Sequence, residues 1–150
     1  MAAFTFETIS AGDAGAYHNA ADTLAFSSPG ATGSQVLVLY AYDSGGTLTG
    51  VSLLHNGRTL AFGAGLAGEL DVSFPGGSIL AIGDLTSMSL GGTTSHDGLF
   101  GGKGDDTLMG FAGDDFMHGN HGADSLAGGA GGDTMYGGQD NDRISTAGDI

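Results

Sequence analysis

The sequence contains no cysteine or tryptophan, and only 2 prolines and 3 basic side chains among its 150 residues. Without cysteine no disulfide can stabilise the fold, and this absence says little about the compartment, because bound metal ions can stabilise a secreted protein instead. The 31 glycines do not indicate collagen, because glycine does not recur at every third position and proline is scarce. The glycines therefore need a different explanation.

The scarcity of basic side chains leaves a strong negative charge. Seventeen Asp and Glu against three Lys and Arg give a formal net charge of −14. Such a chain repels phosphate backbones and anionic lipid surfaces, which argues against nucleic-acid and membrane-surface partners. The longest strongly apolar stretch, Val36 to Tyr42, is far shorter than the roughly 20 residues of a membrane-spanning helix. The first residues also lack the basic segment of an N-terminal signal peptide.

The composition changes near residue 90. Residues 1–90 hold most of the long apolar runs and seven acidic residues, whereas residues 91–150 hold ten acidic residues, all Asp, and 17 of the 31 glycines. We therefore predict an all-β protein with two parts, a β-rich N-terminal domain over residues 1–90 and a repeat domain over residues 91–150.

The second region repeats with a period of nine residues. From Gly92 to Ser145, six successive nonamers begin with Gly, carry Asp at position six and have a large apolar residue at position eight. The position-six residues are Asp97, Asp106, Asp115, Asp124, Asp133 and Asp142. The position-eight residues are Leu99, Leu108, Met117, Leu126, Met135 and Ile144. A merely solubilising acidic surface would not keep Asp in phase with Gly and with an apolar position, so the period indicates a structural repeat.

The spacing predicts a flattened parallel coil. Six Gly-rich residues can turn sharply because Gly accepts positive φ, and three residues make a short strand with one side chain pointing inward. Two nonamers complete one coil of 18 residues, and stacked coils bury the position-eight side chains and pair as parallel sheets. Asp97, Asp115 and Asp133 would then form one column, and Asp106, Asp124 and Asp142 a second on the opposite edge.

Carboxylates in a column about 5 Å apart repel one another strongly unless cations lie between them. Oxygen ligands in a flexible turn favour calcium, which takes 6 to 8 oxygens, over magnesium. With an ion between each adjacent pair of turns, we expect roughly four internal calcium sites. The expected ligands are the position-six carboxylates listed above and carbonyl groups of the turn glycines, namely Gly101, Gly102, Gly104, Gly110, Gly113, Gly119, Gly122, Gly128, Gly129, Gly131 and Gly137.

Segment 92–145 resembles the RTX (repeats-in-toxin) calcium-binding nonapeptide family. Residues 128–136 match the consensus GGxGxDxUx in full, as does the copy that begins at Gly101. The resemblance implies a parallel β-roll, calcium bound by the position-six Asp and turn carbonyls, and export by the type I secretion machinery. Such systems read an uncleaved C-terminal signal. The chain stops at Asp149-Ile150, and a minimal export signal and a fragment of a longer protein both stay open.

Some residues depart from the consensus, and we expect them to weaken the turns that they occupy. Ser95 replaces the fourth Gly in the first copy and Asp140 replaces it in the last. The other departures are Thr93, Phe111, Asn120 and His121. Terminal repeats of a solenoid are commonly atypical, so the edge sites are the least regular ones.

The first 90 residues show the alternation and turn signals of short strands. The clearest is a hairpin of residues 51–55 and 58–62 around Asn56-Gly57, a pair that suits a type I′ turn. This part loosely resembles the β-rich segments found ahead of RTX repeats, and a small β-sandwich and a continuation of the solenoid both stay open. The other expected elements are strands at 4–8, 24–26 and 36–42, a brief helical turn at 16–19, and a second hairpin-like unit at 70–74 and 78–82.

Two groups of residues invite a catalytic or transition-metal interpretation. Ser95, His96 and Asp97 are adjacent in sequence, whereas triad partners converge from separate segments, and no GxSxG motif occurs. His118 and His121 could bind a transition metal, but no HExxH motif accompanies them. We expect no enzymatic activity.

The sequence therefore predicts a secreted, extracellular or cell-surface structural protein. Its open strand edge at Ile144 would pair head to tail with another copy, with residues 3–9 as a possible donor strand, giving a fibre, surface layer or biofilm matrix. The alternative is a calcium-triggered folding and export module of a larger secreted toxin, adhesin or hydrolase. A small bacteriocin is a third, weaker hypothesis. In both the structural-protein hypothesis and the export-module hypothesis, the Asp columns keep the repeats unfolded until extracellular calcium neutralises them.

Overall fold

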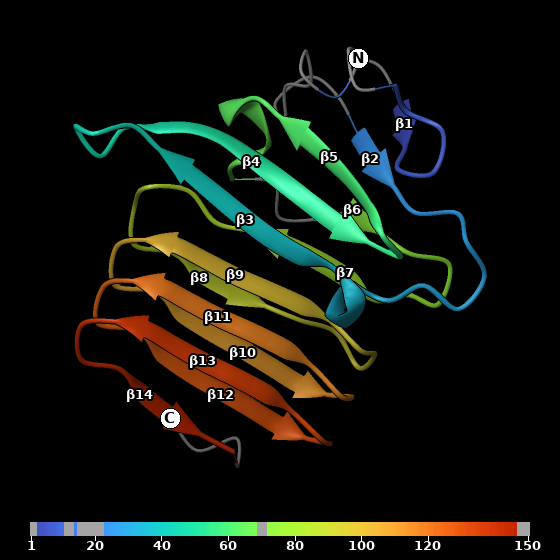
Figure 1. Cartoon of the computed structure of the whole chain (residues 1–150). Coiled ribbons are helices and arrows are strands. Elements are labelled where there is room, and N and C mark those ends of the chain that lie inside the picture. Colours follow the sequence, from blue (N-terminus) through green and yellow to red (C-terminus); the bar gives the residue numbers. More distant parts are fainter. Residues whose placement is uncertain (1–2, 11–13, 15–22, 69–71, 147–150) are drawn as a thin grey trace.

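The computed structural model describes residues 3–10, 14, 23–68 and 72–146, and these residues form short strands arranged in three sheets (Figure 1). The strands of the N-terminal half are β1 (Ala3–Thr5), β2 (Thr23–Ala25), β3 (Leu37–Tyr42), β4 (Leu48–His55), β5 (Arg58–Phe62), β6 (Val72–Ser73) and β7 (Ile79–Ile82). Those of the C-terminal half are β8 (Ser89–Gly91), β9 (Gly98–Lys103), β10 (Thr107–Ala112), β11 (Phe116–His121), β12 (Ser125–Ala130), β13 (Thr134–Gln139) and β14 (Arg143–Ser145). Two 3₁₀ turns, η1 (Gly33–Gln35) and η2 (Ala64–Leu66), complete the set. Among the described residues, no helix has the length and apolar character needed to cross a membrane.

One long sheet runs through the whole molecule. Sheet A has the strand order β1-β2-β6-β7-β9-β11-β13, sheet B has the order β3-β4-β5, and sheet C has the order β14-β12-β10-β8. Side chains alternate across sheet A, so that Leu99 packs in the core shared with sheet C while its neighbour Phe100 packs in the core shared with sheet B. Sheet B therefore covers one face of the N-terminal half of sheet A, and sheet C covers the opposite face of the C-terminal half (Figure 1).

The hairpins expected in the N-terminal half are present. Strands β4 and β5 pair antiparallel, and the turn between them places Asn56 and Gly57 at φ values of 48° and 75°. Strands β6 and β7 also pair antiparallel. Sheets A and B enclose a core of large apolar side chains, so this half contains two packed sheets, while its last strand also joins the solenoid. The helical turn expected at 16–19 lies outside the described residues.

The C-terminal half is the predicted parallel β-roll. Leu108 pairs with Leu126 in sheet C, and Met117 pairs with Met135 in sheet A, each 18 residues further along the chain. The position-eight side chains face inward between the two sheets, and Leu99, Leu108, Met117 and Leu126 are fully buried. The nine-residue period has thus produced one strand per nonamer on alternate faces of the roll.

The 18-residue pairing begins upstream of the Asp-containing repeats. Ala81 of β7 pairs with Leu99, and Leu90 of β8 pairs with Leu108. Two further nonamers, 74–82 and 83–91, therefore belong to the stack, with Ile79 and Met88 at the position that Asp occupies elsewhere. Hydrogen bonding is continuous across residue 90, and the independent folding of residues 1–90 and 91–150 stays a prediction.

Candidate metal centre

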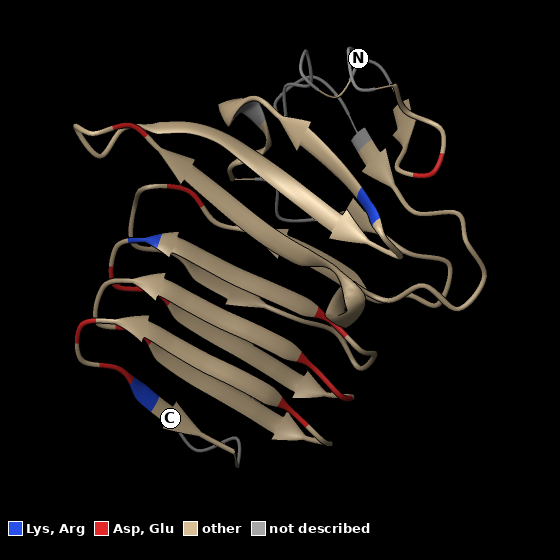
Figure 2. Cartoon of the chain, viewed as in Figure 1, with Lys and Arg blue, Asp and Glu red and all other residues tan. Residues whose placement is uncertain are grey.

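The position-six carboxylates form the two predicted columns, one on each edge of the roll (Figure 2). In the first column, the backbone N–H of Asp97 donates to Asp115 Oδ1 at 2.8 Å, and that of Asp115 donates to Asp133 Oδ1 at 3.2 Å. Each carboxylate thus uses one oxygen to accept a bond from the preceding coil. The second column repeats this pattern from Asp106 N to Asp124 Oδ1 at 2.8 Å and from Asp124 N to Asp142 Oδ1 at 3.0 Å.

In three of the six position-six carboxylates, the other oxygen has no protein partner. Asp106 Oδ2, Asp115 Oδ2 and Asp124 Oδ2 are buried and accept no hydrogen bond, in side chains that are 1 to 2% exposed. A buried, unpaired anionic oxygen is costly, because it has lost its hydration and gained nothing in return. These three atoms therefore indicate where a cation is needed.

Burial also changes the proton affinity of these groups. Burial and the nearby Asp carboxylates together raise the pKa of Asp106 and of Asp115 from 3.8 to about 6, although a backbone hydrogen bond from Met88 or Asp97 opposes the shift. The pKa of Asp124 is raised for the same reason. At neutral pH the columns are anionic at an energetic cost that a bound cation would remove.

The first glycine of each copy leaves an oxygen-lined gap beside the carboxylate. The point where a Cβ of Gly101 would stand lies 2.3 Å from Asp106 Oδ2 and 2.7 Å from the carbonyl oxygen of Gly119. At Gly110 the corresponding distances are 2.3 Å to Asp115 Oδ2 and 2.5 Å to the Gly128 carbonyl. Any side chain at this position would collide with these two oxygens, so glycine keeps the carboxylate and the carbonyl close together, and both are ligands of the kind that calcium prefers. Gly119 repeats the arrangement with Asp124 and the Gly137 carbonyl, whereas Gly128 and Gly137 lie only against the carboxylates of Asp133 and Asp142.

The second and fourth glycines shape the turns rather than the gap. Most of them have positive φ and lie against backbone of the neighbouring coil. A Cβ added at Gly131, for example, would stand 1.9 Å from the carbonyl oxygen of Gly113. A side chain at these positions would collide with backbone, so only Gly fits without a shift. The predicted residues of this type are Gly102, Gly104, Gly113, Gly122, Gly129 and Gly131, and the structure adds Gly138, which the sequence analysis did not include.

The donor set fits calcium when carbonyl groups are included. No group of three or more His, Cys, Asp or Glu side chains within the described residues is arranged to hold a metal. Side chains alone therefore do not complete a site, and backbone carbonyls such as those of Gly119 and Gly128 are the candidates for further protein ligands. Hard carboxylate and carbonyl oxygens are the ligands that calcium prefers.

The N-terminal ends of both columns are closed by backbone N–H groups. Ile79 N donates to Asp97 Oδ1 at 2.7 Å, and Met88 N donates to Asp106 Oδ1 at 2.8 Å. The hydroxyl of Thr93 also donates to Asp97 Oδ2 at 2.9 Å, so both oxygens of Asp97 have partners. Thr93, expected to weaken its turn, instead satisfies the first carboxylate of the column.

The other departures keep the turn at the cost of local strain. Phe111, Asn120 and Asp140 adopt φ values of 72°, 79° and 77°, in the left-handed region that favours glycine. The turns are therefore retained.

A second set of hydrogen bonds from carboxylates to the backbone of the next coil lies outside the position-six columns. Asp105 Oδ1 accepts a bond from Ala123 N, and Asp114 Oδ1 accepts one from Gly132 N. Its signal in the sequence is Asp at position five of two adjacent copies.

The structure separates the residues that invited other interpretations. Ser95 Oγ donates to the Gly76 carbonyl, whereas His96 Nδ1 accepts a bond from Asp114 N, so no triad forms. His118 contacts the ring of Tyr136, and His121 contacts the ring of Tyr42. The two histidines therefore have different aromatic neighbours.

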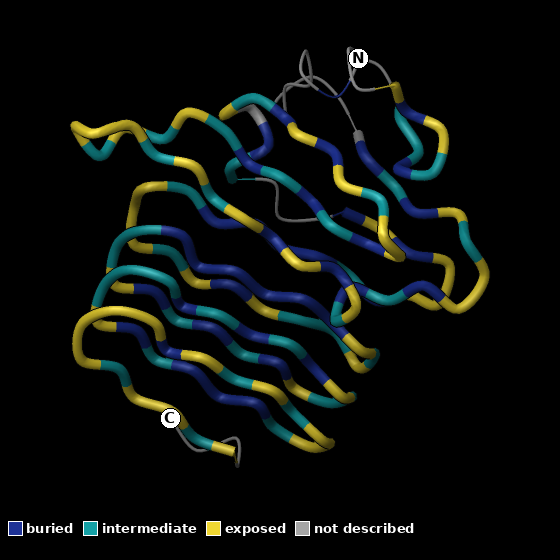
Figure 3. The backbone as a smooth tube through the Cα atoms, viewed as in Figure 1, coloured by how far each residue is buried: buried dark blue, intermediate teal, exposed yellow. Residues whose placement is uncertain are grey.

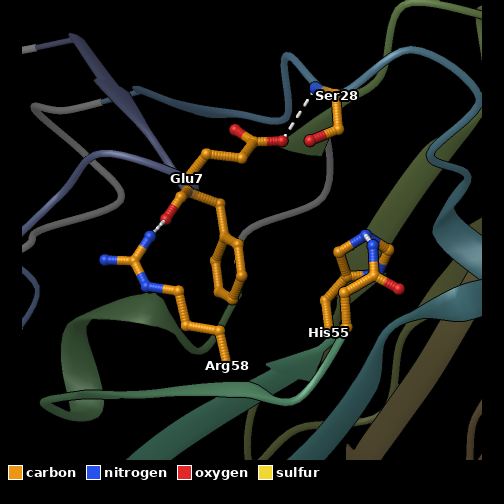
Figure 4. A pocket seen from close by; sticks show the side chains of 6 residues that line it. Glu7, Ser28, His55 and Arg58 are labelled. Atoms are coloured by element: carbon orange, nitrogen blue, oxygen red, sulfur yellow. Dashed lines mark hydrogen bonds between the residues drawn. The ribbon is translucent and has the colours of Figure 1, made fainter.

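A small pocket of about 260 Å³ lies in the N-terminal half, far along the chain from the repeats (Figure 4). The Glu7 carboxylate accepts hydrogen bonds from the backbone of Ser27 and Ser28, and the Arg58 guanidinium donates to the carbonyls of Phe6 and Ile9. Its polar groups thus hold the N-terminal segment against the β4–β5 hairpin.

Comparison with protein families agrees with the geometry. Residues 91–126 and 118–149 match the model of the RTX calcium-binding nonapeptide repeat, with 4 copies. Residues 91–149 are RTX repeats. Nonapeptide repeats of this family bind calcium, so calcium is the ion of the roll. No curated protein and no solved structure was found to be significantly similar to the chain.

Proposed function

We propose that this chain is a secreted, non-enzymatic structural protein whose calcium-loaded roll assembles head to tail. The observation that supports this is the uncovered C-terminal end of the roll. Position eight is fully buried in the four copies from Leu99 to Leu126, but Met135 is only partly buried and Ile144 is 47% exposed. An apolar core that ends in solvent favours a further layer on top of it.

The strand order offers edges for that layer. Sheet A ends with β13 at one extreme and with β1 at the other, and β14 ends sheet C next to β13. A contact between the β13 and β14 end of one copy and the β1 end of the next is heterologous, so it repeats along a filament unless the rotation closes a ring.

The position of residues 3–9 determines how the contact forms. Strand β1 pairs with β2 of its own chain, and Phe6 and Ile9 are buried in the N-terminal core. Donation of this segment to a neighbour would require it to leave that core. We therefore propose contact between edges with β1 in place, rather than full donation of the strand.

Calcium separates export from assembly in this proposal. In a calcium-poor cytoplasm, the unpaired carboxylates of Asp106, Asp115 and Asp124 oppose folding, and an unfolded chain can pass through the type I secretion machinery. Outside the cell, millimolar calcium binds the folded roll and stabilises it by mass action. The product would be a fibre, surface layer or biofilm matrix.

The test is electron microscopy of the purified chain in millimolar calcium and in EDTA, with the variant Ile144→Lys. We expect ordered assemblies that require calcium and are lost in Ile144→Lys, because a buried ammonium group opposes stacking. The matched control is Leu85→Lys, since Leu85 is an exposed apolar residue, 44% exposed, in the turn between β7 and β8. Monodisperse particles in both solutions would overturn the proposal.

The same open end supports one alternative. A further coil of a longer chain would cover Ile144 as well as a second copy would, and the chain would then act as a calcium-triggered folding and export module of a larger secreted toxin, adhesin or hydrolase. Monodisperse particles that fold only in calcium would favour this alternative.

A further inference from the structure

We propose that the outer edge of β3, together with the adjoining outer face of β11 and β13, binds one extended polypeptide strand from a partner protein. We call this surface the ledge and define it by the β3 edge and the side chains of Phe116, His118 and Tyr136. It lies on the face of sheet A, whereas the assembly proposed above uses the end of the roll at the edges of β13 and β14.

The floor of the ledge continues a buried core onto the surface. Phe100 is 1% exposed between sheets A and B, Phe116 is partly buried against the same core, and Tyr136 is 53% exposed. The ring centroids are 5.5 Å apart between Phe100 and Phe116, and 5.7 Å apart between Phe116 and Tyr136. Burial therefore decreases stepwise along one row of aromatic rings. Figure 3 shows the same decrease in the backbone, from the mostly buried β9 to the largely exposed β13.

The wall of the ledge is an uncharged strand edge that is regular over most of its length. Strand β3 ends the order of sheet B, and none of its six residues is charged or proline. Its pairing with β4 shifts register only between Ala41 and Tyr42, at the end of the strand, and its Leu37 and Leu39 are 37% and 48% exposed. Charges, proline or a bulge usually prevent pairing at edge strands, so the regular part of β3 before this shift is a template for strand addition.

The shape of the ledge selects a single strand as the occupant. Tyr40 OH donates to the Gly83 carbonyl at 3.1 Å, and the ring of Tyr42 contacts His121, so β3 lies over the middle of sheet A. Strands β11 and β13 extend beyond it in Figure 1. Packed sheets are about 10 Å apart, one layer of side chains. A folded partner with a second sheet behind its edge strand, including another copy of this chain joined through β3, would collide with β11 and β13.

The chemistry of the ledge selects an apolar strand. Strands β3, β9, β11 and β13 contain no Asp or Glu, although the chain has a net charge of −14. Their one Lys or Arg, Lys103 at the end of β9, donates to the Gly46 carbonyl and lies over the ring of Tyr42. The acidic side chains lie in the turns at the ends of the roll strands (Figure 2). The occupant is therefore an extended segment with apolar side chains at alternate positions, which would face Phe116 and Tyr136 while its backbone pairs with β3.

The experiment uses a synthetic peptide of alternating valine and threonine with one terminal tryptophan, and a control peptide with proline at its centre. Because the protein has no tryptophan, peptide fluorescence anisotropy reports binding directly. We expect saturable binding in millimolar calcium by the Ile144→Lys variant, which keeps the end of the roll from assembling. Amide exchange in β3 should slow on binding.

Two substitutions test the location. Tyr136→Ser should weaken binding at least about tenfold, and Leu85→Ser, at an exposed apolar site away from the ledge, should leave it unchanged. Circular dichroism verifies that both variants fold. Any of four results would overturn the ledge proposal. They are no binding, equal binding of the proline peptide, equal binding by Tyr136→Ser, and slowed amide exchange at the β13 and β14 edges in place of β3. None of these outcomes bears on the proposed assembly, because the variant lacks it.

Discussion

The two halves of the molecule share sheet A but are held together differently. The N-terminal core contains eighteen buried apolar residues, with Phe6, Phe26 and Phe74 stacked at centroid distances of 4.5 and 4.4 Å. Among the described residues, the core of the roll contains six, one from each of the strands β7 to β12. The first half is thus built around a large apolar core, whereas the second combines a narrow core with a buried Asp in four of its six repeats.

The difference shows how a repeat can make folding conditional. Each coil of the roll buries one apolar side chain and one carboxylate per strand and turn, so the hydrophobic gain is offset by the desolvation of an anion. The described residues of the N-terminal half contain no such column. We therefore expect the first half to fold by burial alone and the second to fold when an ion is supplied.

Removal of calcium should give the largest effect and test this comparison directly. A site saturated a thousandfold above its Kd contributes about 4 kcal/mol, so loss of roughly four sites should unfold strands β10 to β14. Hydrogen exchange measured in calcium and in EDTA should show protection lost in these strands and kept in β3, β4 and β5. Magnesium should not restore it, because it demands tight octahedral geometry. Equal loss of protection in both halves would show that they are not held differently.

Substitutions that create a cavity in one core or the other should give the next largest difference between the stabilities of the two halves. Leu53 in the N-terminal core and Leu126 in the roll are both fully buried. In calcium, Leu53→Ala and Leu126→Ala should each lower the free energy of unfolding by about 3 kcal/mol. In EDTA only Leu53→Ala should still lower the denaturant midpoint, since the roll is already unfolded. An equal effect of Leu126→Ala in EDTA would mean that the roll stays folded without calcium.

Substitutions within one column should reveal how the sites are shared. Asp115 lies between Asp97 and Asp133, so Asp115→Asn should remove a ligand from two sites, whereas Asp133→Asn should impair mainly one of the four. Isothermal titration should show a loss of about two bound calcium ions for the first and about one for the second. Asp114→Asn is the matched control, because this side chain is exposed and its Oδ1 acceptor is retained. Equal stoichiometry in all three would exclude the column as the calcium site.

The sequence predicted the columns, the inward apolar positions and the hairpins, because each of these depends on spacing within a short segment. It did not predict that the stack begins upstream, at Ile79 and Met88. Those residues lack the carboxylate, but their backbone N–H groups donate to Asp97 and Asp106 as any residue could. The placement of sheet B over sheet A was also inaccessible, because it depends on contacts such as Tyr40 to Gly83 between distant segments.

The pH dependence should be smaller and opposite in the two halves. Burial raises the pKa of Asp106 and Asp115 to about 6, so in EDTA their protonation stabilises the folded roll below that pH, and this stabilisation is lost as pH rises through about 6. Although burial raises the pKa of Glu7, hydrogen bonds from Ser28 and Ser27 lower it to about 2, so its contribution is lost only as pH falls from 4.5 through about 2.

Urea unfolding in EDTA checks this dependence. Roll structure, followed by hydrogen exchange, should be more protected at pH 5 than at pH 7.5, while the N-terminal half should change little. A roll that is less protected at pH 5 would contradict the sign. In calcium the dependence should reverse, because protons compete with the ion for the same carboxylates.

The smallest effect concerns the strained turns of the roll. Phe111 adopts φ of 72° and is 54% exposed, so its side chain gains little from burial while its backbone occupies a region that suits glycine. Phe111→Gly should relieve about 1 to 2 kcal/mol of strain and add about 0.5 to 1 kcal/mol of unfolded-state entropy, for a net gain near 0.5 kcal/mol. Calcium-loaded thermal unfolding should show a small rise in Tm, whereas Ala112→Gly, at a neighbouring residue without positive φ, should lower it. A lower Tm for Phe111→Gly would mean that the ring, which lies against Gly91, contributes more to packing than its exposure indicates.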